Sequence, residues 1–170
     1  MGLRATCAIA SSPKLRGPGR LILGRSTRHE INGDLQRGQD LQIADHAYVF
    51  VHSSGSLKLG ENVYIGRGAI LTCFNNVEIG SNVRIAERVS IHDENHAYEP
   101  APVADRSLYT TKPVAIGSGV WIGANSVILP GTVIGDDSVV GAGSVVRGTF
   151  PARSLIAGVP ARVVREIAKA

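Results

Sequence analysis

The chain has 170 residues, a length that suits one domain with a sizeable core. Its residues are 44% hydrophobic but only 5% aromatic, and no apolar run is long enough to span a membrane as a helix. The net charge is +4 at pH 7, but aromatic residues are not interleaved with the basic ones, which argues against a nucleic-acid partner.

The first 20 residues follow no regular pattern and are expected to form an arm in front of a domain that spans residues 21–170. Basic residues are frequent near this end: Arg4, Lys14, Arg16, Arg20, Arg25 and Arg28. A solvated face is the simpler interpretation of these charges, and contact with an anionic partner is the alternative. The two cysteines, Cys7 and Cys73, show no disulfide spacing, so we interpret them as free thiols of a cytoplasmic protein.

A six-residue repeat dominates the chain from Leu59 onwards. Each hexad has an aliphatic residue, usually Gly next, two variable positions, and a small residue or Val in the fifth place. Nine hexads share this pattern, and they begin at Leu59, Ile65, Ile79, Ile85, Ile116, Ile122, Ile128, Ile134 and Val140. The period fits neither a helix nor an alternating strand. It predicts short strands between turns, with three strands closing a triangular coil of about 18 residues that buries its aliphatic side chains against neighbouring coils. Residues 20–58 fit less well and are expected to form an irregular first coil or cap.

The repeat is interrupted between Ile91 and Val114. We expect residues 92–113 to form a loop that leaves the solenoid and returns to it in place of about one coil, and such loops are usually functional. The loop opens with the polar run HDENH, which includes two histidines, His92 and His96. A neutral imidazole can take the proton of an attacking hydroxyl, so both histidines are candidate general bases.

After the last hexads, Pro151 and Pro160 break the pattern, and residues 161–170 are expected to form a short closing helix. The strings VWIGANSVILPGTVIGDDSVVGAGSVV and AGVPARVVREI resemble the hexapeptide-repeat acyltransferases over residues 57–168. The resemblance is nearest to the branch that acetylates maltose, galactosides and cell-surface polysaccharides. It implies a left-handed parallel β-helix, an exception to the usual handedness of parallel crossovers.

The resemblance also implies an activity and a partner. Members transfer acetyl from acetyl-coenzyme A to a hydroxyl of a sugar-like acceptor, without a metal, in sites between the subunits of a homotrimer. The family carries D-x-N-H or T-G-H about two dozen residues before the Trp of VWIG, and His96 precedes Trp121 by 25 residues. His96 is therefore expected to be the base, with Asp93 or Asn95 beside it to orient its ring or contact the acceptor.

Other positions follow from the same match. The residues expected to contact the coenzyme are Trp121, Ala124, Ala142, Arg147, Arg162 and Arg165. Phe74, Asn75 and Asn76 are expected to form the floor of the acceptor site. The galactoside branch has Asn where this chain has Gly66 and an acidic residue at Phe74 or Asn75, so galactoside itself is a doubtful acceptor. The branch usually has Ser at Ala124, so the oxyanion would be stabilised by backbone N–H groups.

Two other functions share this fold. A γ-type carbonic anhydrase binds zinc through three histidines, for which His52, His92 and His96 are available, although the last two are one residue too close. The terminal AGVPARVVR favours the acyltransferases. A non-catalytic scaffold is the second alternative, and the dense polar run around His96 argues against it.

Overall fold

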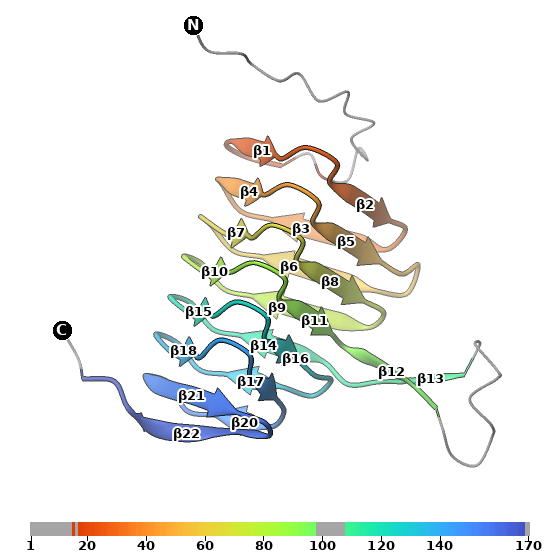
Figure 1. The fold of residues 1–170 in the computed structure, drawn as a ribbon. Helices are drawn as coiled ribbons and strands as arrows, with labels where there is room; N and C mark the ends of the chain where they lie inside the picture. Colours follow the sequence, from red (N-terminus) through yellow and green to blue (C-terminus); the bar gives the residue numbers. More distant parts are fainter. Residues whose placement is uncertain (1–14, 16, 98–107, 169–170) are drawn as a thin grey trace, which may run out of the picture.

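The computed structural model describes residue 15 and residues 17–97 and 108–168, which wind into a triangular solenoid of parallel strands (Figure 1). Sheet A contains, in spatial order, β1 (Leu21–Leu23), β4 (Leu41–Ile43), β7 (Tyr64–Ile65), β10 (Arg84–Ile85), β15 (Trp121–Ile122), β18 (Val139–Val140), β21 (Ser154–Gly158) and β22 (Ala161–Glu166). Sheet B contains β2 (Arg28–Ile31), β5 (Tyr48–Val51), β8 (Ile70–Cys73), β11 (Ser90–His92), β16 (Val127–Ile128) and β19 (Val145–Val146). Sheet C contains β3 (Asp34–Arg37), β6 (Ser56–Leu59), β9 (Asn76–Ile79), β14 (Val114–Ile116), β17 (Val133–Ile134) and β20 (Thr149–Phe150).

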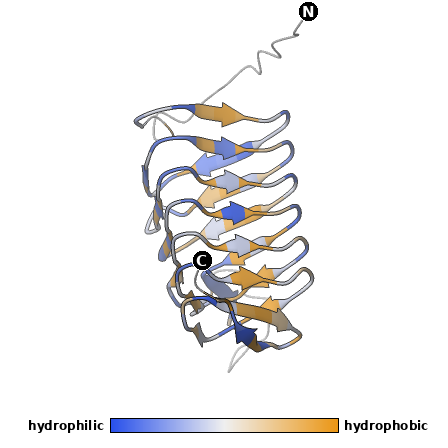
Figure 2. Cartoon of the chain, turned by 90° about the vertical axis from the view of Figure 1, so that its left-hand side faces the viewer, coloured by the Kyte–Doolittle hydropathy of each residue, from blue (hydrophilic) through white to orange (hydrophobic). Residues whose placement is uncertain are grey.

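Successive strands visit the three sheets in turn, so that β1, β2 and β3 form one coil and β4 begins the next one below it. The chain crosses the front of Figure 1 from β1 to β2 and returns behind through β3, which makes the winding left-handed as expected. Viewed from the side, the coils stack as parallel rungs (Figure 2). No helix in the described part of the chain is long and apolar enough to cross a membrane.

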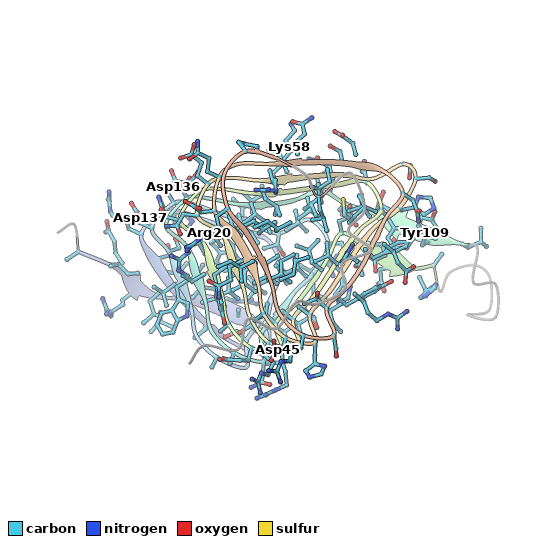
Figure 3. All side chains as sticks on the ribbon, turned by 90° about the horizontal axis from the view of Figure 1, so that it is seen from above. Arg20, Asp45, Lys58, Tyr109, Asp136 and Asp137 are labelled. Atoms are coloured by element: carbon cyan, nitrogen blue, oxygen red, sulfur yellow. The ribbon has the colours of Figure 1, made fainter. Side chains whose placement is uncertain are left out.

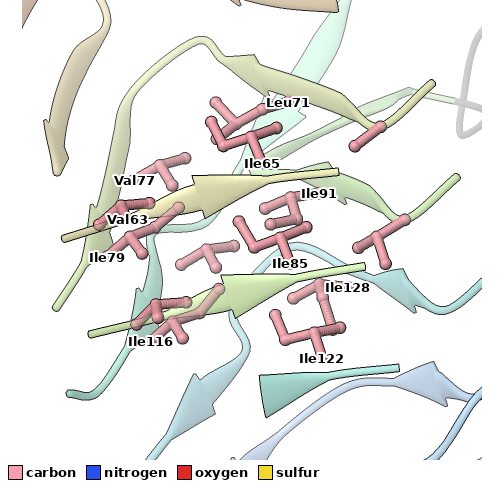
Figure 4. Close-up of a cluster of buried hydrophobic side chains, with 14 of the residues drawn as sticks. Val63, Ile65, Leu71, Val77, Ile79, Ile85, Ile91, Ile116, Ile122 and Ile128 are labelled. Atoms are coloured by element: carbon pink, nitrogen blue, oxygen red, sulfur yellow. The ribbon is translucent and has the colours of Figure 1, made fainter. Parts of the chain in front are cut away.

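The solenoid core is built from the predicted hexads. The first and fifth residues of all nine hexads are at most 5% exposed where they are hydrophobic, and the polar ones, Ser126, Thr132, Ser138 and Ser144, are also buried. Ile65, Ile85 and Ile122 lie one above the other in successive coils (Figure 4). The buried hydroxyls are satisfied by backbone carbonyls, as in the 2.6 Å hydrogen bond that Ser144 Oγ donates to the Gly141 oxygen. Gly is favoured at the second position because the coils approach closely there: a Cβ on Gly123 would lie 2.6 Å from the backbone nitrogen of Ala142 in the next coil.

The expectation of an irregular cap over residues 20–58 was wrong. These residues form regular coils, in which Leu21 pairs with Leu41 and Gln42 with Tyr64. Partners are therefore 20 or 22 residues apart here, against 18 between Trp121 and Val139. Longer strands and corners lengthen the early coils, so their inward residues fall out of phase with the strict hexads.

The predicted interruption is confirmed. Arg84 and Trp121 pair in neighbouring coils although they are 37 residues apart, so a single coil carries the whole insertion. The described ends of the insertion form an antiparallel hairpin of β12 (Glu94–His96) and β13 (Tyr109–Thr111) that projects from the solenoid between sheets B and C.

The closing helix predicted for residues 161–170 is not present in the described residues. Ala161–Glu166 is strand β22, which turns back at Val159-Pro160 and pairs antiparallel with β21. The last strand of sheet A would otherwise leave its edge unpaired, and the β-branched pair Val163 and Val164 favours an extended chain that covers this edge.

Candidate functional site

The hairpin that carries His96 is anchored by a buried carboxylate. Asp93 lies between β11 and β12 and is 0% exposed. Its carboxylate accepts hydrogen bonds from the backbone N–H groups of Phe74, Asn75 and Asn76, at 2.7, 2.7 and 2.8 Å. Burial raises the pKa of Asp93, and these three hydrogen bonds oppose the rise. The sequence placed Asp93 beside an acceptor or the His96 ring, whereas its carboxylate fixes the corner of the preceding coil.

The hairpin presents two different faces. His96 pairs with Tyr109 and Glu94 with Thr111, and paired residues of an antiparallel ladder share a face. This face looks toward the earlier coils, because Tyr109 packs on Phe74 and Glu94 accepts a hydrogen bond from Thr72. The opposite face carries Asn95 and Thr110.

A groove of about 580 Å³ runs along the hairpin and continues onto the later coils. Predicted catalytic, acceptor and coenzyme residues all line it, and its side chains include His92, Asn95, His96, Lys112, Leu129 and Arg147. His96 itself is exposed. The groove therefore combines two imidazoles with two cationic side chains and one carboxylate, that of Glu94. The two cationic side chains suit an anionic group of a ligand, and an imidazole beside them can accept a proton.

His92 is the more firmly held of the two histidines. Its Nδ1 lies 2.8 Å from Thr72 Oγ1, and the Thr72 hydroxyl donates to Glu94 at 2.8 Å. Because that hydroxyl has a single proton, its oxygen accepts a hydrogen bond from His92 Nδ1–H. In the neutral imidazole this tautomer makes Nε2 the acceptor nitrogen. The sequence analysis missed Thr72 and Glu94 as partners, since Thr72 is 20 residues away from His92 and meets it only through coil stacking.

The predicted coenzyme residues lie mainly on sheet A and the adjoining corner. Trp121 is 54% exposed and stands in one cross-strand line with Val139, Leu155 and Arg165. On the neighbouring strand β21, Arg162 pairs with Ala157 and Arg165 pairs with Leu155. Ala157 and Leu155 are two residues apart and share a face, so the bulge in β22 puts Arg162 and Arg165 on one face of the strand as well.

Two alanines complete this side of the molecule. Ala124 and Ala142 occupy equivalent turns between sheets A and B, and the Gly143 N–H donates to the Ala124 carbonyl at 2.8 Å, which stacks one turn on the other. Both alanines therefore border the strip that contains Trp121.

A single chain does not bring all the predicted residues together. Trp121 belongs to sheet A, whereas the hairpin with His96 projects at the corner between sheets B and C (Figure 1). Seen along the solenoid axis in Figure 3, Tyr109 of the hairpin marks one corner of the triangle, and Asp45 and Asp136 mark the other two. Arg147 lies with His96 in the hairpin groove, apart from the other predicted coenzyme residues.

Metal and thiol chemistry find little support in the residues that the structure describes. Among them, no three or more His, Cys, Asp or Glu side chains are grouped as metal ligands. Cys73 is buried, which raises the pKa of its thiol to about 12 and makes it a poor nucleophile.

A left-handed solenoid of hexads with an inserted polar hairpin defines the class of hexapeptide-repeat proteins. Residues 113–148 match the family model described as bacterial transferase hexapeptide (six repeats). The putative lipopolysaccharide biosynthesis O-acetyl transferase WbbJ of Escherichia coli is 34% identical over 147 residues, which cover 69% of this chain and 75% of the relative. The chain therefore belongs to the hexapeptide-repeat acetyltransferase family.

Other relatives agree with this assignment. The galactoside O-acetyltransferase of Escherichia coli is 38% identical over 70% of this chain, and a probable acetyltransferase of Mycobacterium tuberculosis is 32% identical over 91%. The matched parts span 58% and 53% of the lengths of these two relatives.

Solved structures show the same fold. A galactoside acetyltransferase in complex with coenzyme A has a TM-score of 0.51 and 30% identity, and covers 84% of this chain and 66% of that one. A Ser-to-Thr mutant of AntD, an N-acyltransferase from Bacillus cereus in complex with dTDP and coenzyme A, has a TM-score of 0.75 at 20% identity, covering 89% of this chain and 82% of its own.

Proposed function

We propose that this chain transfers an acetyl group from acetyl-coenzyme A to a hydroxyl of a sugar or related small molecule, with His96 as the general base. The observation that carries the proposal is the position of His96, exposed on an anchored hairpin above a groove that also contains Lys112 and Arg147. Family membership and the coenzyme A complex of a related structure support the choice of donor.

The reaction needs a base because a sugar hydroxyl is a weak nucleophile at neutral pH. The imidazole of His96 takes the hydroxyl proton while the hydroxyl oxygen attacks the thioester carbonyl carbon. The C–S bond then breaks, and the proton passes from the imidazole to the departing sulfur, which gives an acetyl ester and free coenzyme A. No side-chain hydroxyl stands at Ala124, so backbone N–H groups of the turns are the available donors for the oxyanion.

The strip on sheet A suits the arm of the coenzyme. Trp121, Val139 and Leu155 offer an apolar wall, and Arg165 ends the line three strand spacings away, or about 14 Å. A coenzyme laid along this strip would place its phosphates at Arg162 and Arg165, while its thioester end would lie beside Trp121.

This arrangement requires two chains for each site, because one chain holds its hairpin and its sheet A strip apart. We therefore expect a threefold homotrimer in which the hairpin of one chain meets the strip of the next. Size exclusion with light scattering is expected to give three times the chain mass of 17.9 kDa. A monomer would contradict this assembly.

Arg162 and Arg165 are expected to recognise the 3′-phosphate of the coenzyme. Both are exposed, so we expect a contribution of about 1 kcal/mol each, or about a fivefold change in affinity, which decreases as salt rises. The measurement compares the affinities of wild type, Arg162→Ala and Arg165→Ala for acetyl-coenzyme A and its dephospho form at low and high salt. Arg28→Ala, at the opposite end of the solenoid, is the control. Equal weakening of both ligands would show that these arginines do not contact the 3′-phosphate.

The proposed activity is tested by release of the coenzyme A thiol. Acetyl-coenzyme A is presented with a panel of sugars, nucleotide-sugars and hydroxylated natural products, and the expected result is acceptor-dependent thiol release with an acetyl ester as product. Release without any acceptor dependence, or no release at all, would favour a non-catalytic scaffold.

A further inference from the structure

Four rings gather on the outside of the solenoid where the hairpin begins: Phe50, His52, Phe74 and Tyr109, which we call the aromatic corner. The His52 and Phe74 rings are stacked, with centroids 5.0 Å apart and planes 5° from parallel. The Tyr109 ring stands at 71° to Phe74 with its centroid 4.8 Å away, and Phe50 lies 5.4 Å from Phe74. The rings therefore form a floor and an upright wall.

The aromatic corner is not part of the solenoid core. Among the described residues, the buried core cluster contains a single aromatic side chain, Phe150, whereas all four rings of the corner are only half-buried. The chain has only eight Phe, Tyr and Trp residues, and three of them meet here. In so aromatic-poor a chain, partly exposed rings that do not fill the core indicate a surface for a ligand.

The position of the rings is fixed by hydrogen bonds beneath them. Ser54 Oγ donates to the Phe74 carbonyl at 2.8 Å and lies 2.8 Å from His52 Nδ1, so it links the two stacked residues. Asp93 holds the turn of Phe74 through three backbone N–H groups. A surface held in this way loses little conformational entropy when a ligand binds.

The corner also lies on the same side of the hairpin as the proposed base. His96 and Tyr109 are register partners, so their side chains share one face, and Tyr109 is the upright wall. The cationic residues Lys112 and Arg147 line the groove that continues onto the later coils. His96 also lines this groove, so it lies where the aromatic face of the hairpin meets the cationic groove.

We infer that the aromatic corner binds the acceptor, and that the acceptor carries a planar aromatic ring next to the part that bears the reactive hydroxyl. This inference rests on the proposed function, because it takes His96 as the base that the hydroxyl must reach. An aryl group linked to a sugar and the base of a nucleotide-sugar share this chemistry.

The test compares phenyl β-D-glucoside with methyl β-D-glucoside, using kcat/KM for acetyl transfer and the dissociation constant from calorimetry. The phenyl compound is expected to be favoured about tenfold in both, which corresponds to 1.4 kcal/mol. In Phe74→Leu and Tyr109→Leu the ratio is expected to fall to about twofold. Tyr64→Leu is the matched control, since Tyr64 lies on β7 of sheet A, away from the corner, and it should keep the wild-type ratio.

The outcomes separate the two proposals. A ratio near one in the wild type, or a ratio that Phe74→Leu and Tyr109→Leu leave unchanged, overturns the aromatic acceptor. Tighter, Phe74-dependent binding of the phenyl compound without any acetyl transfer would support the site and contradict the acetyltransferase. UDP-glucose distinguishes the source of the ring. If its kcat/KM, relative to that of methyl glucoside, is higher than the same ratio for phenyl glucoside, the acceptor is a nucleotide-sugar.

Discussion

Replacement of His96 by Ala is expected to lower kcat for acetyl transfer by about 10² to 10⁴, the usual contribution of a general base. The imidazole is exposed at the end of β12, outside the solenoid core, so its loss should change the free energy of unfolding by less than about 0.5 kcal/mol. Steady-state thiol release measures the first effect, and the thermal melting midpoint measures the second.

His92→Ala is the paired control for this prediction. His92 lines the same groove, but its Nδ1 is engaged with Thr72, and Glu94 lies 3.4 Å away. We expect His92→Ala to reduce activity less than His96→Ala, because the loss loosens the groove wall and leaves the proposed base in place. If His96→Ala keeps a third of wild-type turnover while His92→Ala does not, then the base is His92, held by Thr72 and Glu94.

The sequence predicted the part of the fold that a strict period encodes. Inward residues such as Ile122 and Ser126 repeat every six positions, so their burial and the parallel stacking of the coils follow from the spacing alone. The coils before Leu59 were missed because extra corner residues change the spacing without changing the packing. Strand β22 was missed because the choice between helix and strand depended on the open edge of β21, which only the folded solenoid supplies.

The site was predictable only where a local motif marks it. His96 lies in the HDENH run and could be selected from the sequence. Tyr109 could not, since it lies 35 residues after Phe74 and comes close to it only through the hairpin register and the stacking of coils. For the same reason, Thr72 and Glu94 were missed as partners of His92. Residues that touch between coils are separated in sequence by the local coil length, which varies along the chain and cannot be read from a fixed period.

Asp93→Ala is expected to have the largest effect on stability. The substitution leaves three backbone N–H groups of one corner, those of Phe74, Asn75 and Asn76, without their acceptor. Each buried donor without a partner costs about 1–3 kcal/mol, and water can reach this half-buried corner, so we expect a total near 3 kcal/mol. For a chain of this size the melting midpoint should fall by about 6–12 °C.

Two further variants sharpen this prediction. Asp136 accepts one backbone N–H, from Ser118 at 2.7 Å, on an exposed corner, so Asp136→Ala should cost less than about 1 kcal/mol. Asp93→Asn keeps one carbonyl oxygen, and its NH₂ group must then face at least one of the backbone donors, so its melting midpoint should lie between those of wild type and Asp93→Ala. Equal midpoints for Asp93→Ala and Asp136→Ala would show that the corner does not depend on the buried carboxylate.

If the corner does depend on the Asp93 carboxylate, Asp93→Ala should also lower the preference for phenyl over methyl glucoside, because the same turn positions Phe74.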